Sequence, residues 1–169
     1  MKRLFFALWP DHKTRLRCWE ISRHLPKTGL RLVGPENLHI TLVFVGAADS
    51  RIEASLIEAA DSITPSKIAI NFNQISYWRK PGILCLTGQA LDLKLQTLVS
   101  SLTKICETQG IMVDQRPYVP HVTLARKAKA ASTFEFEPFI WRAENFCLVQ
   151  SNSGINGSEY QVIREWAKK

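Results

Sequence analysis

The sequence lacks the residue patterns that mark several common classes of functional site. Its four cysteines are widely scattered and form no Cys-x-x-Cys pair, which argues against a structural zinc site and against a disulfide framework. It contains no Gly-rich phosphate loop, no Gly-x-Ser-x-Gly sequence and no His-Glu-x-x-His sequence. The motifs of phosphate-loop nucleotide binding, of one class of serine hydrolase and of one class of zinc protease are therefore absent.

Long apolar runs and low-complexity segments are absent as well. No apolar run approaches the ~20 residues that a membrane-spanning helix requires. Residues 1–9 combine two basic residues with a short apolar run, but Pro10 and Asp11 end that run and no small-residue cleavage site follows. This favours a first strand over a signal peptide, and we expect a cytoplasmic protein with no membrane partner.

What the sequence does contain is a surplus of positive charge on an otherwise ordinary composition. Its 169 residues include 22 Lys and Arg against 15 Asp and Glu, a formal net charge of +7, and 46% of them are hydrophobic. A basic surface suits a polyanionic partner, because binding to phosphates releases counterions, although solubility alone also accounts for such a charge. The length fits one domain, residues 1–169, with a buried core.

Strand-like and helix-like segments alternate along the chain. The patterns predict helices over residues 10–24, 51–62 and 91–109, and strands over residues 3–9, 38–45, 68–72, 83–87, 121–126, 139–150 and 160–166. Ser50 is the predicted N-cap of the second helix, with Glu53 as its capping-box partner. Residues 77–80, which mix aromatic and basic side chains, are predicted to form a loop. This order of segments indicates a single α+β domain.

The most informative feature is a short internal repeat. The sequence His-Ile-Thr-Leu at residues 39–42 recurs as His-Val-Thr-Leu at residues 121–124, each time after a proline-bearing approach and within a predicted strand. Because side chains alternate along a strand, the His and Thr of each copy project to one face and the two apolar residues to the other. Such a strand is suited to line a cleft with its polar face and a core with its apolar face.

Paired histidines suit the hydrolysis of a cyclic phosphodiester. That reaction needs a base to take a proton from water and an acid to protonate the departing sugar oxygen. Imidazole serves both ends, because its pKa of about 6.5 allows either protonation state near neutrality. His39 and His121 are the candidate acid/base pair, and the hydroxyls of Thr41 and Thr123 are placed to donate hydrogen bonds to phosphoryl oxygens.

Other uses of the histidines are less well supported by the sequence. A single histidine in a strand is more often structural than catalytic, but two matched copies are hard to obtain by chance. A metal site is the competing use, yet there is no His-x-His spacing and neither predicted strand carries a carboxylate beside its histidine. No cysteine neighbours either motif, and His12 and His24 lack any comparable context.

Several blocks of the sequence together resemble the 2H phosphoesterases, specifically the bacterial-type RNA 2′,3′-cyclic phosphodiesterases, also called 2′-5′ RNA ligases. The resemblance covers nearly the whole chain. The blocks that carry it are, in order, RLFFA at 3–7, PENLHITL at 35–42, RPYVPHVTLAR at 116–126, LVQS at 148–151, Tyr160, and Glu-Trp at 165–166.

The resemblance implies a fold of two pseudo-symmetric lobes, each an antiparallel sheet with outer helices, around a central cleft that carries both His-x-Thr motifs. It implies that His39 is the proton donor to the leaving 3′-oxygen and His121 the proton acceptor that activates water. The product would be a 2′-phosphomonoester, formed without a metal or other cofactor. The partner would be RNA with a 2′,3′-cyclic phosphate end, tRNA fragments among them, with reverse 2′-5′ ligation left open, and we expect a monomer.

Two residues beside the motifs are candidate substrate contacts. Phe44 closes the first motif strand and is a candidate to stack on a base, or else an ordinary core aromatic. Arg126 ends the second motif strand, within reach of a phosphate or a base. Residues 77–80 are further candidates for RNA contact, with Trp78 expected to be structural.

Two other functions remain open from the sequence. One is a 2H phosphodiesterase for a small substrate, such as ADP-ribose cyclic phosphate or a cyclic nucleotide, because only the walls of the pocket would differ. The other is a non-catalytic RNA-binding module, which the charge permits but which has no need of two matched His-x-Thr pairs.

Overall fold

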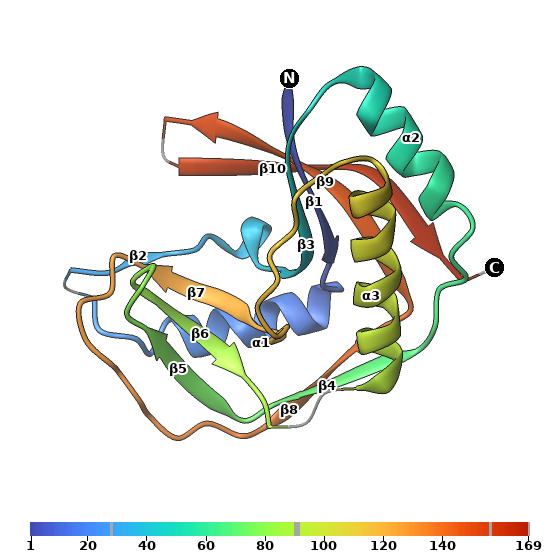
Figure 1. The fold of residues 1–169 in the computed structure, drawn as a ribbon. Helices are drawn as coiled ribbons and strands as arrows, with labels where there is room; N and C mark the ends of the chain where they lie inside the picture. Colours follow the sequence, from blue (N-terminus) through green and yellow to red (C-terminus); the bar gives the residue numbers. More distant parts are fainter. Residues whose placement is uncertain (28, 90–91, 156, 169) are drawn as a thin grey trace.

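Antiparallel strands make up most of the architecture in this computed structural model, which describes residues 1–27, 29–89, 92–155 and 157–168 (Figure 1). The helices are α1 (His12–Ser22), α2 (Ser50–Ala60) and α3 (Leu93–Thr108), with a 3-10 turn η1 (Pro35–Asn37). The strands are β1 (Lys2–Leu8), β2 (Arg31–Leu32), β3 (Ile40–Ala48), β4 (Ile68–Phe72), β5 (Gln74–Trp78), β6 (Ile83–Thr87), β7 (Val122–Arg126), β8 (Phe139–Ala143), β9 (Asn145–Gly154) and β10 (Gly157–Ala167).

The strands of the main sheet divide into two groups that meet at β3 and β7. Their order is β10-β9-β1-β3-β7-β6-β5, with β2 also paired to β7, and every pairing is antiparallel. The two groups are joined by the pairing of Ile40 in β3 with Val122 in β7. β4 and β8 form a separate two-stranded antiparallel sheet. The predicted α+β fold, with antiparallel sheet around the two motifs, is confirmed.

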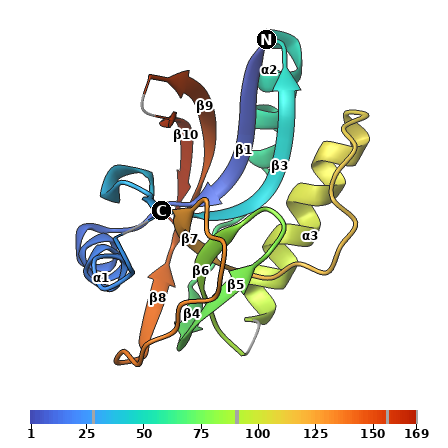
Figure 2. The same cartoon turned by 90° about the vertical axis from the view of Figure 1, so that its left-hand side faces the viewer.

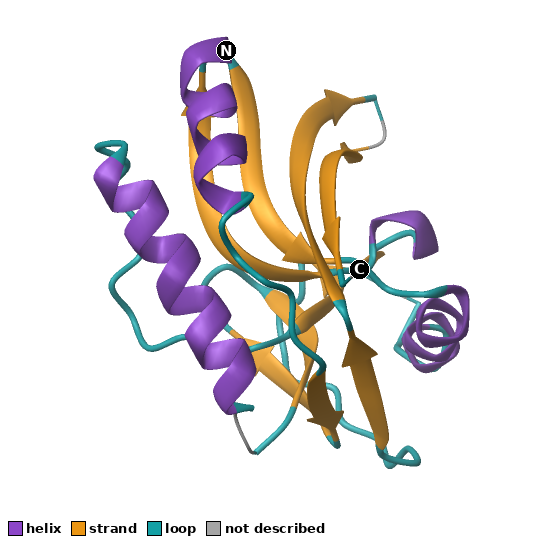
Figure 3. Cartoon of the chain, turned by 90° about the vertical axis from the view of Figure 1, so that its right-hand side faces the viewer, coloured by secondary structure: helices purple, strands orange, loops and turns teal. Residues whose placement is uncertain are grey.

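Helices cover the sheet from outside and bury the main hydrophobic core, while a second, smaller cluster of Phe5, Ala7, Cys147 and Val149 lies on β1 and β9. α2 and α3 lie on one side of the strands and α1 on the other (Figures 2 and 3). The core includes the fully buried side chains of Phe6, Phe72, Trp141 and Phe146. No helix among the residues described is long and apolar enough to span a membrane.

An aspartate caps the N-terminus of each α-helix. The side chain of Asp11 accepts a hydrogen bond from the amide of Thr14, and Asp49 and Asp92 do the same at α2 and α3. The prediction that Ser50 caps the second helix is therefore wrong. Ser50 is the first helical residue, and Glu53 pairs with Lys2 instead of closing a capping box.

The structure also corrects several predicted boundaries. Residues 77 and 78 belong to β5 rather than to a loop, and the predicted strand 139–150 is divided at Glu144 into β8 and β9. The third helix ends before Gly110, whose φ of +74° suits glycine, as the sequence predicts. Its predicted first residue, Leu91, lies outside the described residues. His39 and His121 each lie one residue before their strand begins.

Candidate active site

Strands β3 and β7 bring the two copies of the repeat together. Ile40 of β3 lies opposite Val122 of β7 in an antiparallel pair, and the polar neighbours of these two residues, His39, Thr41, His121 and Thr123, all line one cavity. These four polar side chains are half-buried, whereas the alternating apolar residues Ile40, Leu42, Val122 and Leu124 are buried. One residue pair between two strands thus gathers both His-x-Thr motifs on a single face of the sheet.

Each imidazole is held by a backbone carbonyl two residues before it. The Nδ1 atom of His39 lies 2.7 Å from the carbonyl oxygen of Asn37, and Nδ1 of His121 lies 2.9 Å from that of Val119. A carbonyl oxygen only accepts, so Nδ1 carries the proton in both rings. In the neutral histidine this leaves Nε2 as the atom that exchanges protons. Nε2 of His39 is 3.1 Å from the hydroxyl of Thr41.

Aromatic rings surround the histidines. Trp9 stacks on His39 with ring centroids 5.5 Å apart and an interplanar angle of 14°, and the edge of Tyr160 approaches the same ring at 5.0 Å. Trp78 contacts His121 with ring centroids 4.4 Å apart. The sequence predicted Trp78 to be structural and gave no role to Trp9 or Tyr160, because the order of strands is what brings these rings to the site.

Burial and positive neighbours hold both histidines toward the neutral form in the unliganded protein. Burial lowers the pKa of His39 to about 4, opposed by its hydrogen bond to Asn37 and assisted by the charges of His121 and Arg126. Burial also lowers the pKa of His121, again with the charge of Arg126 acting in the same direction. An anion bound between these groups would favour their protonated forms.

Phe44 reaches the polar face of β3 because of a β-bulge. Thr41 and Val43 pair with consecutive residues of β1, which leaves Leu42 as an extra residue in β3. Beyond an extra residue the alternation of side chains is reversed, so Phe44 lies on the same side as Thr41. The ring is 65% exposed and lines the cavity that contains both histidines. A base could stack there, and the ring is no part of the core.

A matching bulge brings Arg126 to the site. Thr123 and Ala125 pair with consecutive residues of β6, which leaves Leu124 as the extra residue in β7. Arg126 is exposed and lines the cavity. Phe44 and Arg126 therefore occupy equivalent positions, each five residues after its histidine.

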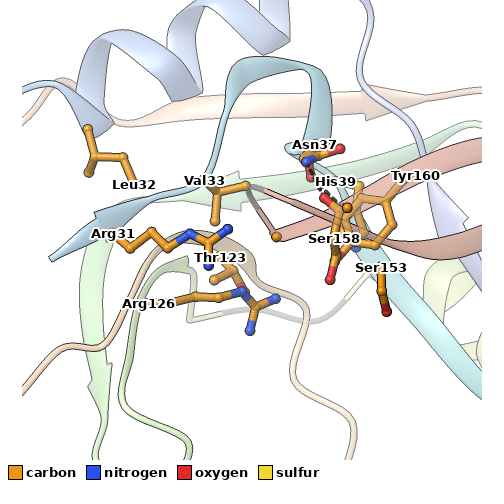
Figure 4. A pocket seen from close by; sticks show the side chains of 12 residues that line it. Arg31, Leu32, Val33, Asn37, His39, Thr123, Arg126, Ser153, Ser158 and Tyr160 are labelled. Carbon is orange, nitrogen blue, oxygen red and sulfur yellow. Dashed lines mark hydrogen bonds between the residues drawn. The ribbon is translucent and has the colours of Figure 1, made fainter.

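Two adjoining cavities open onto these residues. The first, of about 420 Å³, is lined by both histidines, Phe44 and Arg126, among others. The second, of about 330 Å³, is lined by His39, Arg126 and Arg31 but not by His121 (Figure 4). Sizes of this order suit a nucleotide. Arg31 was not among the site residues expected from the sequence.

The described residues contain no group of three or more His, Cys, Asp and Glu side chains positioned to hold a metal ion. The four cysteines are buried, and burial raises the pKa of the Cys18 and Cys147 thiols to about 12. Nucleophilic thiolates are thus disfavoured near neutral pH.

Comparison with known proteins places the chain in a family. The profile described as LigT like Phosphoesterase matches residues 11–85. The RNA 2′,3′-cyclic phosphodiesterase of Bacillus subtilis is 37% identical over 131 residues, 70% of each chain, and that of Escherichia coli is 27% identical over 170 residues, 98% of this chain and 96% of the relative. The crystal structure of E. coli LigT complexed with 3′-AMP superposes with a TM-score of 0.91 at 25% identity, covering 99% of this chain and 98% of that one.

A pair of His-x-Thr motifs on one face of an antiparallel sheet is what the resemblance to the 2H phosphoesterases led us to expect. The chain belongs to the LigT-like phosphoesterases of that class.

Proposed function

We propose that this protein hydrolyses RNA 2′,3′-cyclic phosphate ends to 2′-phosphomonoesters, with His39 and His121 as the acid/base pair. The observation that carries the proposal is the register of β3 on β7, which gathers both histidines and both threonines on one face of the sheet. The relatives that match most of the chain are named RNA 2′,3′-cyclic phosphodiesterases, which supports RNA as the substrate class.

The proposed reaction is a single in-line displacement at phosphorus. Neutral His121 accepts a proton from water through Nε2 as the water oxygen bonds to phosphorus. The bond from phosphorus to the 3′-oxygen breaks, and protonated His39 donates its Nε2 proton to that oxygen. The product keeps the phosphate on the 2′-oxygen. A following proton exchange with solvent restores both histidines.

The neighbouring side chains stabilise charge on the phosphoryl oxygens. The hydroxyls of Thr41 and Thr123 lie on the same face as the imidazoles and donate to the two non-bridging oxygens. The guanidinium of Arg126 adds a charge-assisted contact, and Phe44 offers an exposed face on which a base stacks. None of these groups requires a metal or other cofactor for its role.

A small cyclic phosphate is the alternative substrate. E. coli LigT has been crystallised in complex with 3′-AMP, which is a single nucleotide. A cavity of this family therefore accepts a ligand of that size. RNA ends, among them those of tRNA fragments, are favoured for this chain because of its net charge of +7. A cytoplasmic monomer that also catalyses the reverse ligation is compatible with the same site.

The test is to incubate chelator-treated protein with an RNA that ends in a 2′,3′-cyclic phosphate and to identify the product isomer. The proposal expects a 2′-phosphomonoester in undiminished yield. A 3′-phosphomonoester, or activity that returns only with an added divalent ion, would contradict it. ADP-ribose cyclic phosphate and 2′,3′-cyclic AMP, assayed in parallel, identify the substrate class by the larger kcat/KM.

A further inference from the structure

Arg31 is a charged residue of the site that the hydrolysis step does not use. Strand β2 places it directly opposite Arg126 of β7, and both side chains point into the cavity beside His39 (Figure 4). Neither guanidinium forms an ion pair with a carboxylate of the described residues. Two like charges directed into one cavity repel each other, and an anion between them relieves that repulsion.

The hairpin of β9 and β10 leaves room for the Arg31 side chain. The guanidinium of Arg31 lies over Gly157, where a Cβ atom would come within 1.7 Å of Nη2 of Arg31. Gly157 also has a φ of +124°, which other residues rarely adopt. Arg31 therefore spans the gap from β2 to this hairpin, with the hydroxyl-bearing residues Ser153 and Ser158 lining the same cavity.

The reaction geometry indicates which part of a substrate enters this cavity. Water attacks from the side of His121, so the departing 3′-oxygen and its ribose lie on the side of His39. The cavity that contains Arg31 is lined by His39 and not by His121. The ribose and whatever is attached to its 5′-oxygen are thus directed toward Arg31.

We propose that Arg31, with Arg126 beside it, binds the phosphate on the 5′-oxygen of the terminal nucleotide, so that the enzyme favours an RNA chain over a lone nucleoside cyclic phosphate. This inference rests on the proposed function. The phosphate is the next phosphodiester of the RNA backbone. Two guanidiniums suit it because arginine donates paired hydrogen bonds to phosphate oxygens.

The experiment compares three substrates: a nucleoside 2′,3′-cyclic phosphate, the same molecule with a 5′-monophosphate, and a dinucleotide ending in the cyclic phosphate. For the wild type, kcat/KM should be higher for the dinucleotide than for the nucleoside. Arg31→Gln should reduce that preference by about tenfold, chiefly through KM, and Arg31→Lys should restore part of it. Arg51→Gln, on the exposed side of α2, is the matched control and should leave the preference unchanged.

Each other outcome contradicts a specific part of the inference. If Arg31→Gln lowers kcat/KM equally for the nucleoside and the dinucleotide, the 5′-phosphate does not bind in this cavity. If the preference for the dinucleotide is lost in Arg3→Gln instead, the RNA chain leaves the site through the cavity beside Phe44, which Arg3 lines. An effect confined to the 5′-monophosphate would assign the cavity to a free nucleotide. Failure of the wild type to turn over any of the three would overturn the proposed function itself.

Discussion

The surroundings of the two imidazoles determine how the rate should respond to pH. One histidine must be protonated and the other neutral, so kcat/KM, which reports the free enzyme, should follow a bell. Burial lowers both pKa values, that of His39 to about 4, so the bell should be centred below the ordinary imidazole pKa of about 6.5. The ordinary imidazole pKa, which is all that the sequence offers, would instead place the optimum near neutrality, because burial is not visible in the sequence.

The profile of kcat should lie at higher pH than that of kcat/KM. In the complex, the anionic phosphate favours the imidazolium form and raises the pKa values that the unliganded site lowers. Rates measured between pH 4 and 9 at low and at saturating substrate provide both profiles. Coincident optima, or an optimum of kcat/KM above that of kcat, would contradict this electrostatic account. Both apparent pKa values belong to the coupled pair.

The contact of Trp9 with His39 should also matter for the rate. An indole face attracts a nearby cation by about 0.5–1 kcal/mol, so stacking stabilises protonated His39. Trp9→Leu should lower kcat/KM about two- to fivefold and move the acid limb, which reports the lower pKa of His39, to lower pH. Trp166→Leu, a buried indole that stacks on Phe146 away from the histidines, is the control for a general loss of packing. A reduced rate with an unmoved limb would mean that Trp9 acts only as a packing residue.

Among single residues, the four motif residues could be predicted from the sequence, because a repeat of His-x-Thr is visible without knowledge of the fold. Phe44 and Arg126 could be named from their place beside the motifs, but not their orientation, which depends on bulges at Leu42 and Leu124. Arg31 and Trp9 carried no local signal, and Tyr160 contributed only to the family resemblance, with no indication that it lies beside His39. Their proximity to the site arises from strand order.

At the scale of elements, the correction at the start of α2 gives a direct stability test. The side chain of Asp49 accepts from the amide of Ile52, whereas Ser50 lies inside the helix. Asp49→Ala should lower the free energy of unfolding by about 1 kcal/mol, and Ser50→Ala should change it by less than about 0.5 kcal/mol. Urea denaturation of the two variants measures both values, and a larger loss for Ser50→Ala would mean that the cap lies where the sequence placed it.

The elements that the sequence predicted well are those with a strong local pattern. The helix at α3 and the strands at β4 and β6 carry clear apolar periods, whereas α1 is marked mainly by the turn signal of Pro10 and Asp11 before it. β5 was missed because Trp78 and the basic residues after it read as an exposed loop, yet the strand is held by pairing with β6. β8 and β9 were joined into one strand because only Glu144 separates two apolar runs.

At the scale of the whole molecule, the excess positive charge predicts a difference between long and short ligands. Each phosphate contact along a single strand should add about −0.7 to the slope of log K against log salt. Binding of an oligonucleotide with a cyclic phosphate end should therefore weaken more steeply with salt than binding of a cyclic mononucleotide. Affinities measured at several salt concentrations give both slopes. Equal slopes would favour a small substrate and count against the proposed RNA path over Arg31.

Each of the two groups of strands contributes one histidine, and the groups meet at β3 and β7. Catalysis should therefore require both histidines together. The most direct measurement is the single-turnover rate of His39→Ala, His121→Ala and the double variant on an RNA with a 2′,3′-cyclic phosphate end, beside RNA affinity. Each single change should cost about 10²- to 10⁴-fold in rate with little loss of affinity. The double change should cost less than the product of the two, because the residues act as one unit. A single variant that keeps near wild-type turnover would contradict the two-histidine mechanism.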